Sequence, residues 1–435
     1  MTNRDTGPEG GWGTPPSPRY EDLAARFRPV FARIAASAVE RDTTRRLPHA
    51  EIRELRDAGF PLLRLPEDLG GAGASLPELF GLLLELSAAD SNVTNALRAH
   101  FGFTEEVLNH EDAAWRGHWL GRIAAGDTVG SGHSETGENP VGGHTTRLES
   151  RDGRLFVTGR KFYTTGSLFA NWINTALVDE AGEIRGVLVP VRAAGVAIDD
   201  DWDGFGQALT ASGTARFEAV EVDPVSLRPG ERRLPYGHAF YQLVHLATLA
   251  GIARAASAHV ARLLAERRRI YARGNANRAA DDPQLLQVVG RVRSAAYAAG
   301  AVALHAAEAL ERVWQAHRAG EGEERIQELA ALAELEVSQS VTVVSTLVLE
   351  ATTLLFDALG ASATRRGEGL DRYWRNARTI TSHNPRVYHD RIVGRFAVTG
   401  EIERGVPGVG LPPAEDAAPT GADPRPAPVL AVAAG

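Results

Sequence analysis

Apolar residues recur at helical spacing through the first quarter of the chain. From Tyr20 to Asp57 two helical patterns follow one another, and the first places apolar residues at i, i+4, i+7, i+8 and i+11: Leu23, Phe27, Val30, Phe31 and Ile34. Further helical patterns cover residues 76–89 and 91–108. We therefore predict an N-terminal helical domain over residues 19–128. A Gly/Pro-rich tail, residues 1–18, precedes it and is predicted to be disordered.

The pattern changes to β character between Val129 and Val222. Short runs rich in β-branched and aromatic residues predict strands over 154–158, 171–178, 184–191 and 214–222. These strands are grouped between helical segments and do not alternate with helices. The arrangement favours an α+β fold over a parallel Rossmann sheet, with a central β-barrel or β-sandwich domain over residues 129–232.

Three long, alanine-rich helical patterns follow, over residues 236–272, 282–320 and 323–359. Leucine and valine at helical spacing predict that they pack as an antiparallel bundle, a four-helix C-terminal domain over residues 233–400. Helices that are apolar on several sides also favour a homo-oligomer. The Pro/Ala-rich segment 401–435 is predicted to be a flexible tail.

Three loops of the β region carry the candidate binding chemistry: Ser131–Glu135, Lys161–Ser167 and Gly206–Gly213. Each combines hydroxyl groups and backbone N–H groups with glycine, which suits a polar heterocycle with many hydrogen-bond acceptors. The alternative is that Ser, Thr and Gly are simply turn formers here.

Composition excludes several other classes of function. A formal net charge of −8 gives no indication of nucleic-acid binding, and the absence of cysteine excludes disulfides and thiolate metal sites. His383 and His389 lack a third ligand at sensible spacing, so no metal is expected. No apolar run approaches the roughly 18 residues that span a bilayer, so we expect no membrane association and a cytoplasmic location.

Two motifs carry a family resemblance: Lys161-Phe-Tyr-Thr-Thr-Gly-Ser167 and Trp202-Asp-Gly-Phe-Gly-Gln-Ala-Leu-Thr-Ala-Ser-Gly-Thr214. They resemble the central domain of the acyl-CoA dehydrogenase superfamily, and more closely its flavin-dependent monooxygenase branch, the dibenzothiophene monooxygenase-like enzymes. The resemblance extends from about residue 22 to about residue 400. It implies a homotetramer in which neighbouring subunits complete one another's flavin sites.

A second segment separates the two branches. Arg375-Asn-Ala-Arg378 resembles the dehydrogenases, which place a catalytic glutamate six residues after the second arginine. Asn384 stands at that position here, and asparagine cannot act as a carboxylate base. His383-Asn-Pro385 instead resembles the His-Asp/Asn-Pro pattern of the monooxygenases.

The resemblance implies an oxygenase that uses reduced FMN and O₂. In such enzymes a C4a-hydroperoxyflavin transfers oxygen to sulfur, nitrogen or carbon of a small, largely apolar substrate. His383 and His100 are the candidate catalytic residues, because an imidazole can manage the proton of the peroxide. The alternatives are a core position for His100 and a capping role for His383.

Binding residues are carried over one by one. The cofactor is expected to contact Ser131, Ser134, Tyr163, Thr164, Thr165, Arg375 and Arg378. The substrate is expected to contact Phe103, Trp202, Ser212 and Asn384. FMN is favoured over FAD, the alternative, because the dehydrogenase segment that supports adenine is not recognisable in residues 271–277.

We therefore expect a two-component monooxygenase that receives reduced FMN from a separate NAD(P)H-flavin reductase. One alternative is an FAD-dependent acyl-CoA dehydrogenase with a relocated base. The other is a catalytically silent flavin-fold scaffold.

Overall fold

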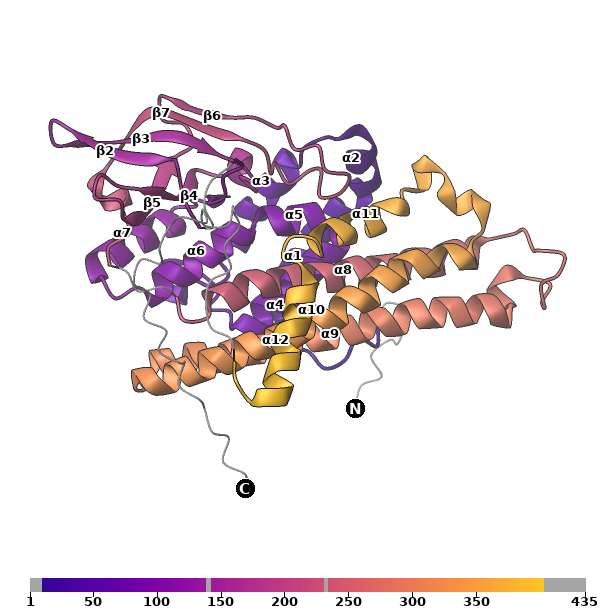
Figure 1. Ribbon diagram of the computed structural model, residues 1–435. Coiled ribbons are helices and arrows are strands. Elements are labelled where there is room, and N and C mark those ends of the chain that lie inside the picture. The colour runs from indigo at the N-terminus through magenta and orange to yellow at the C-terminus, as the bar shows by residue number, and fades with distance from the viewer. Residues whose placement is uncertain (1–9, 138–141, 231–233, 403–435) are drawn as a thin grey trace, which may run out of the picture.

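A computed structural model describes residues 10–137, 142–230 and 234–402 (Figure 1). Most of the two predicted tails, residues 1–9 and 403–435, lies outside the described residues. Seven helices form the N-terminal layer: α1 (Tyr20–Ala36), α2 (Ala38–Thr44), α3 (His49–Asp57), α4 (Leu76–Ala89), α5 (Ser91–Ala96), α6 (Arg98–Asn109) and α7 (Ala113–Ala124). The predicted helix over residues 91–108 is interrupted at Leu97.

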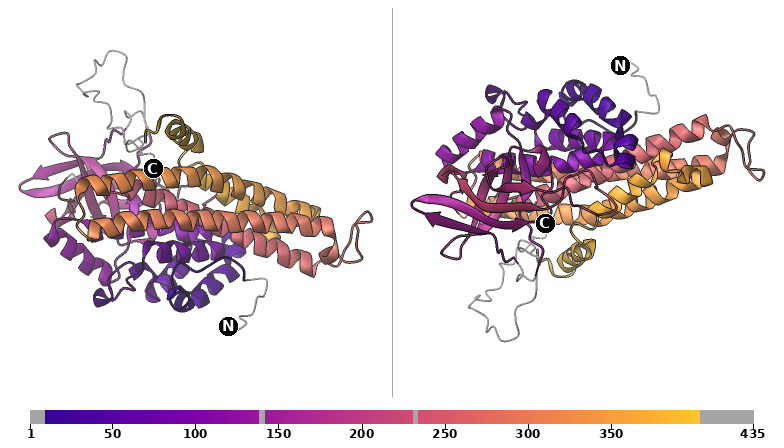
Figure 2. Two further views of the ribbon diagram at one scale, coloured as in Figure 1. Left: turned by 90° about the horizontal axis from the view of Figure 1, so that it is seen from below. Right: turned by 90° about the horizontal axis from the view of Figure 1, so that it is seen from above.

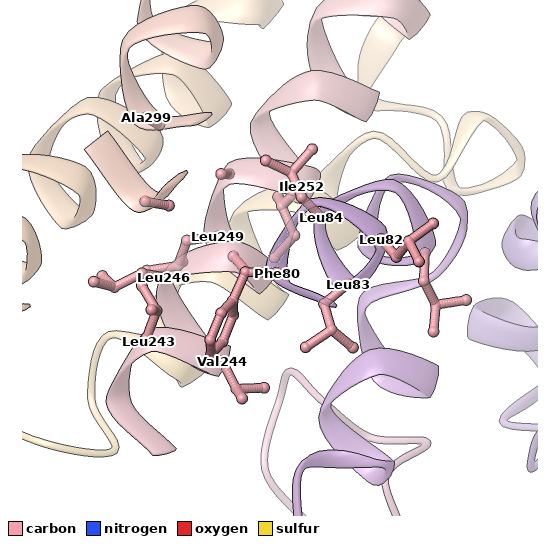
Figure 3. Close-up of a cluster of buried hydrophobic side chains, with 14 of the residues drawn as sticks. Phe80, Leu82, Leu83, Leu84, Leu243, Val244, Leu246, Leu249, Ile252 and Ala299 are labelled. Atoms are coloured by element: carbon pink, nitrogen blue, oxygen red, sulfur yellow. The ribbon is translucent and has the colours of Figure 1, made fainter. Parts of the chain in front are cut away.

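Helix α4 joins the N-terminal layer to the rest of the molecule. Its start is fixed by a capping box, in which Ser75 and Glu78 satisfy each other's backbone N–H groups. The helix is apolar on most sides, and Figure 3 shows Phe80 of α4 beside Val244 of the later helix α8 (Gly237–Glu266). Burial of these side chains stabilises the contact by about 25 cal/mol per Å² of apolar surface removed from water.

Residues 10–18 differ from the expected disordered tail. The indole of Trp12 packs against the main core and lies beneath the guanidinium groups of Arg254 and Arg293, at 4.8 and 4.2 Å from the ring centroid. The sequence prediction relied on Gly and Pro content and gave this one aromatic anchor no weight.

The central domain is one curled, mixed sheet with the strand order β1-β4-β2-β3-β7-β6, and β5 pairs with β4. Its strands are β1 (Val129–Gly132), β2 (Arg147–Arg151), β3 (Arg154–Lys161), β4 (Trp172–Val178), β5 (Ile184–Pro190), β6 (Val196–Ile198) and β7 (Ala215–Val222). The sheet has its own core around Val157, Ile173 and Phe217. Strand β1 runs parallel to β4, which places Ser131 opposite Asn174.

The C-terminal layer is built from α8 (Gly237–Glu266), α9 (Pro283–Arg318) and α10 (Glu323–Leu354). Figure 2 shows the three helices side by side, extending well beyond the sheet. Helix α11 (Asp371–Ile380) packs against α8 and α10, and α12 (Arg386–Thr399) packs against α10. The chain therefore has the predicted α+β architecture, with helical layers before and after a central sheet.

Two helical segments are long and apolar enough to cross a bilayer by length and composition alone, which corrects the expectation that no such run exists. In α8, 78% of the apolar window is buried inside the protein, so the core accounts for its apolar character. In the segment Glu323–Ala358 only 44% is buried, so α10 keeps an apolar surface.

Candidate active site

The three loops predicted to bind a heterocycle meet at one end of the sheet. The hydroxyl of Ser212 lies 2.7 Å from those of both Thr165 and Thr210, and Thr164 donates to the carbonyl of Gly213 over 2.9 Å. The backbone N–H of Ser131 donates to the carbonyl of Thr165. Hydrogen bonds from side-chain hydroxyls and from backbone groups thus join the three loops.

Backbone strain is concentrated in the same loops. Tyr163, Gln207 and Ala211 have φ values of 57°, 52° and 52°, the left-handed region that side chains other than glycine rarely adopt. Such conformations persist only where the surrounding structure holds them, and they cluster at ligand sites. This strain distinguishes the loops from ordinary turns.

Gln207 connects these loops to two helices. Its backbone N–H donates to Oδ1 of Asn376 on α11, and its side-chain Nε2 donates to the hydroxyl of Ser91 on α5. Its Oε1 accepts a hydrogen bond from Asn95, also on α5. The side chain is buried, so the sheet, the N-terminal layer and α11 meet at one residue. The sequence prediction missed this role.

His383, which follows α11, is held by a chain of hydrogen bonds. Arg98 of α6 places Nη2 3.4 Å from Nε2 of His383, Nδ1 of His383 lies 3.3 Å from Oδ1 of Asn384, and Asn384 donates to Gln242 of α8 over 2.7 Å. Arginine can only donate, so Nε2 is the acceptor and Nδ1 carries the proton.

His383 is therefore a neutral imidazole. Desolvation by neighbouring groups, and then the positive charge of Arg98, lower its pKa below the usual range, although the residue as a whole is partly open to solvent in this single chain. Asn384 was predicted to contact the substrate. In the structure its Oδ1 faces His383 and its Nδ2 donates to Gln242, and its contact with the substrate stays a prediction.

His245 of α8 was not predicted and lies directly against His383, with ring centroids 4.5 Å apart. It is 2% exposed, and its Nδ1 has no hydrogen-bond partner in the described part of the chain. His245 is one of three histidines in a long apolar helix and gave no signal in the sequence, because most such residues are core residues.

His100 and Phe103 lie deeper in the N-terminal layer. Nε2 of His100 donates to the carbonyl of Pro61 over 2.9 Å, and burial lowers the pKa of this histidine to about 4. No contact joins it to His383 among the residues described, so its catalytic role stays a prediction. Phe103 is 1% exposed and packs against Trp115 and Trp119, and its contact with the substrate also stays a prediction.

The two arginines predicted to contact the cofactor, at its phosphate or at the isoalloxazine edge, differ. Arg375 forms ion pairs with Asp42 and Asp371, so it links α11 to α2 and is not free for a phosphate. Arg378 is half-buried, and its guanidinium has no partner within the described ranges. Trp202 donates to the carbonyl of Gly206 and lies 5.8 Å from the half-exposed ring of Tyr163, so this aromatic pair borders the third loop.

The residues present fit a flavin. The hydroxyls of Ser131 and Ser134 have no hydrogen-bond partner among the described residues, and they can meet the acceptors of an isoalloxazine ring. The amide oxygens of Asn95 and Asn174 are buried and also lack partners there, which complements the single ring N–H.

Comparison with known proteins agrees with this arrangement. Family models for the acyl-CoA dehydrogenase N-terminal and C-terminal domains match residues 18–127 and 243–386. A probable FMNH2-dependent monooxygenase, SfnC, from Pseudomonas putida is 28% identical over 393 residues, 88% of this chain and 96% of the relative. Dibenzothiophene monooxygenase from Rhodococcus qingshengii is 26% identical, over 87% of this chain and 94% of the relative.

Solved structures agree as well. FMN-bound TdsC from Paenibacillus sp. A11-2 matches with a TM-score of 0.80 and 25% identity, over 88% of this chain and 98% of that one. The fold has helical layers on both sides of a central sheet, and the matches cover most of the chain. The chain therefore belongs to the flavin-dependent monooxygenase branch of the acyl-CoA dehydrogenase superfamily.

Proposed function

We propose that this protein is the oxygenase of a two-component system, which uses reduced FMN and O₂ to oxygenate a small sulfur compound. The names of its relatives support this activity, since they include an FMNH2-dependent monooxygenase and dibenzothiophene monooxygenases. The FMN-bound relative supports FMN as the cofactor.

One observation carries the proposal: Asn384, next to His383, stands at the position where the related dehydrogenases carry a carboxylate base. The acidic groups bound to α11 are Asp42 and Asp371, and Arg375 engages both. Within the described residues, no carboxylate hydrogen-bonds to His383 or Asn384. An acyl-CoA dehydrogenase must remove an α-proton, so this arrangement disfavours that alternative.

When bound, reduced FMN supplies two electrons to O₂, so that one oxygen atom enters the substrate and the other leaves as water. The protein's task is then to position the reactants, exclude water and manage one proton. Neutral His383 can accept a proton at Nε2. Asn384 and Gln242 act as positioning residues, because they fix the tautomer and orientation of that ring.

The same proposal includes two partners. A separate NAD(P)H-flavin reductase would supply reduced FMN, and a homotetramer would complete the site. Large hydrophobic residues are exposed on the bundle, among them Leu286, Tyr297 and Val343. His383 is also open to solvent in one chain, whereas oxygen transfer needs a dry site. A cytoplasmic location belongs to this proposal too.

The test supplies photoreduced FMN and ¹⁸O₂ to the purified protein with dibenzothiophene, dimethyl sulfone or methanesulfinate. We expect one ¹⁸O atom in a product detected by mass spectrometry, and more product when an NADH-driven flavin reductase replaces photoreduction. Bleaching of bound flavin by acyl-CoA esters, without oxygen incorporation into any of the three compounds, would refute the proposal. Light scattering of the eluting protein checks the tetramer separately.

A further inference from the structure

Arg98 is an arginine without an acidic partner. It is the first residue of α6, it is half-buried, and none of the ion pairs among the described residues includes it. Its guanidinium lies 5.3 Å from the ring centroid of Tyr241 and contacts the acceptor nitrogen of His383. Partly buried cations are costly to keep unless an anion or ligand compensates them.

The side chains around Arg98 add hydrogen-bond donors and no negative charge. The hydroxyl of Tyr241 has no acceptor among the described residues, and Glu106, the acidic residue that influences it, is paired with Arg228. Nδ1 of buried His245 is likewise without a partner there. The group therefore offers a cation, a phenol and the imidazole of His245 to a single acceptor-rich ligand.

Gly102 makes room for this group. A Cβ atom at that position would lie 2.2 Å from the ring of Tyr241, so glycine allows the phenol to sit directly against α6, one turn from Arg98. The packing of Tyr241 against Gly102 holds the phenol ring below the guanidinium of Arg98. The face of an aromatic ring attracts a cation in this position. The chain thus positions Arg98 by packing and leaves its remaining N–H groups for a ligand.

We propose that Arg98, Tyr241 and His245 bind the anionic head of the substrate, an organic acid such as a sulfinate, sulfonate or carboxylate, beside His383. This inference rests on the proposed function and deepens it. The substrate is then a small anion, in contrast to the largely apolar molecule expected from the sequence. A bidentate contact from arginine would orient the acid group and hold the rest of the molecule in a fixed place.

The phosphate of FMN is also an anion that these side chains could bind. The experiment therefore distinguishes an anionic substrate from the flavin phosphate. Calorimetry on the FMN-loaded protein, without reductant, would measure binding of methanesulfinate and benzoate, with dimethyl sulfone and benzamide as neutral counterparts. We expect the anions to bind more tightly than their counterparts. We expect Arg98→Gln to reduce the affinity for both anions about 10- to 100-fold. Arg98→Lys should retain part of that affinity.

Arg26→Gln is the matched control, because Arg26 also lies 5.3 Å from an aromatic ring, that of Phe27, but on an exposed face of α1. Arg98→Gln should melt no lower than the wild type, since it removes an uncompensated cation.

Four results would overturn the proposal. The first is wild-type protein that binds none of the anions, and the second is equal binding of anions and neutral probes. The third is Arg98→Gln protein that loses affinity for FMN but not for riboflavin, which would assign Arg98 to the flavin phosphate. The fourth is dissociation of the oligomer on substitution. Anion binding without ¹⁸O incorporation would instead leave this inference standing and refute the proposed activity.

Discussion

Nζ of Lys161 donates a hydrogen bond to Oε1 of Glu135 over 2.7 Å, and both side chains are almost fully buried. Lys161 is the only lysine of the chain. Burial opposes ionisation of Glu135, but hydrogen bonds from Lys161 and Thr145 hold its pKa well below the usual range. The pair therefore ties the loop that follows β1 to the end of β3, next to the predicted flavin contacts.

Replacing Lys161 with methionine should leave a buried carboxylate without its cation. We expect a loss of about 3–5 kcal/mol in the free energy of unfolding, together with weaker FMN binding. Urea denaturation and flavin titration measure the two effects. The double variant Lys161→Met/Glu135→Gln should recover much of the stability, and a double variant no more stable than the single one would contradict the explanation.

The pKa of His383 should rise when Arg98 is replaced by glutamine. Desolvation by neighbouring groups, and then the charge of Arg98, disfavour the imidazolium form of His383. Removal of that charge therefore makes protonation easier. The other titratable groups around the ring are His245 and His238 of α8. Burial, and then the charge of Arg98, also lower the pKa of His245, so the signals of both residues are followed in the same titration. NMR titration of the histidine C–H signals measures the shift, and the acid limb of the pH–rate profile should move to higher pH. An unchanged pKa would show that Arg98 does not act on His383.

Gly206 should tolerate no side chain. A Cβ atom there would lie 2.1 Å from the carbonyl oxygen of Arg375, so Gly206→Ala must push the third loop away from α11. We expect about 10-fold weaker FMN binding, measured by fluorescence titration. Gly121→Ala in α7 is the control, because nothing lies within 4 Å of its Cβ position and its affinity should match the wild type. Equal affinities for both variants would argue against a role of this contact in the flavin site.

Arg41 should be the arginine most important for stability in the N-terminal layer. Its fully buried guanidinium binds both Glu51 and Asp90, which hold α2, α3 and the start of α5 together. Arg41→Met should cost about 3–5 kcal/mol in urea denaturation, since two carboxylates lose their partner. Arg33→Ala removes an exposed pair with Glu54 and should cost less than about 1 kcal/mol. Similar losses in the two variants would mean that burial does not decide the effect.

Local pattern predicted most of the elements. Helix α4 and strands β3, β4, β5 and β7 follow their hydrophobic periodicity, because each buries a continuous apolar face. Strands β1, β2 and β6 escaped prediction, since β1 and β6 have only four and three residues and β2 is largely polar. The break at Leu97 coincides with a tertiary contact that local pattern does not encode, since Gly166 packs against the carbonyl of Ala96, where a Cβ atom would lie 2.1 Å away.

The site was predictable only in part. The three loops of the β region and His383 lie in recognisable motifs, so the sequence singled them out. The structure brings these loops together as expected. Arg98 and His383 are 285 positions apart, and their contact depends on the docking of α6, α8 and the end of α11. No local pattern encodes that docking. Arg375 and Phe103 have suitable chemistry for their predicted roles, but neighbouring side chains already engage them.

The position of Gln207 has a consequence for folding. Because one buried amide joins the sheet, α5 and α11, a partly assembled chain lacks a complete cofactor cradle, even if each layer has formed its own helices or strands. The protein should therefore bind flavin only after the three layers have assembled. On heating, release of the yellow flavin should coincide with the first separation of the layers.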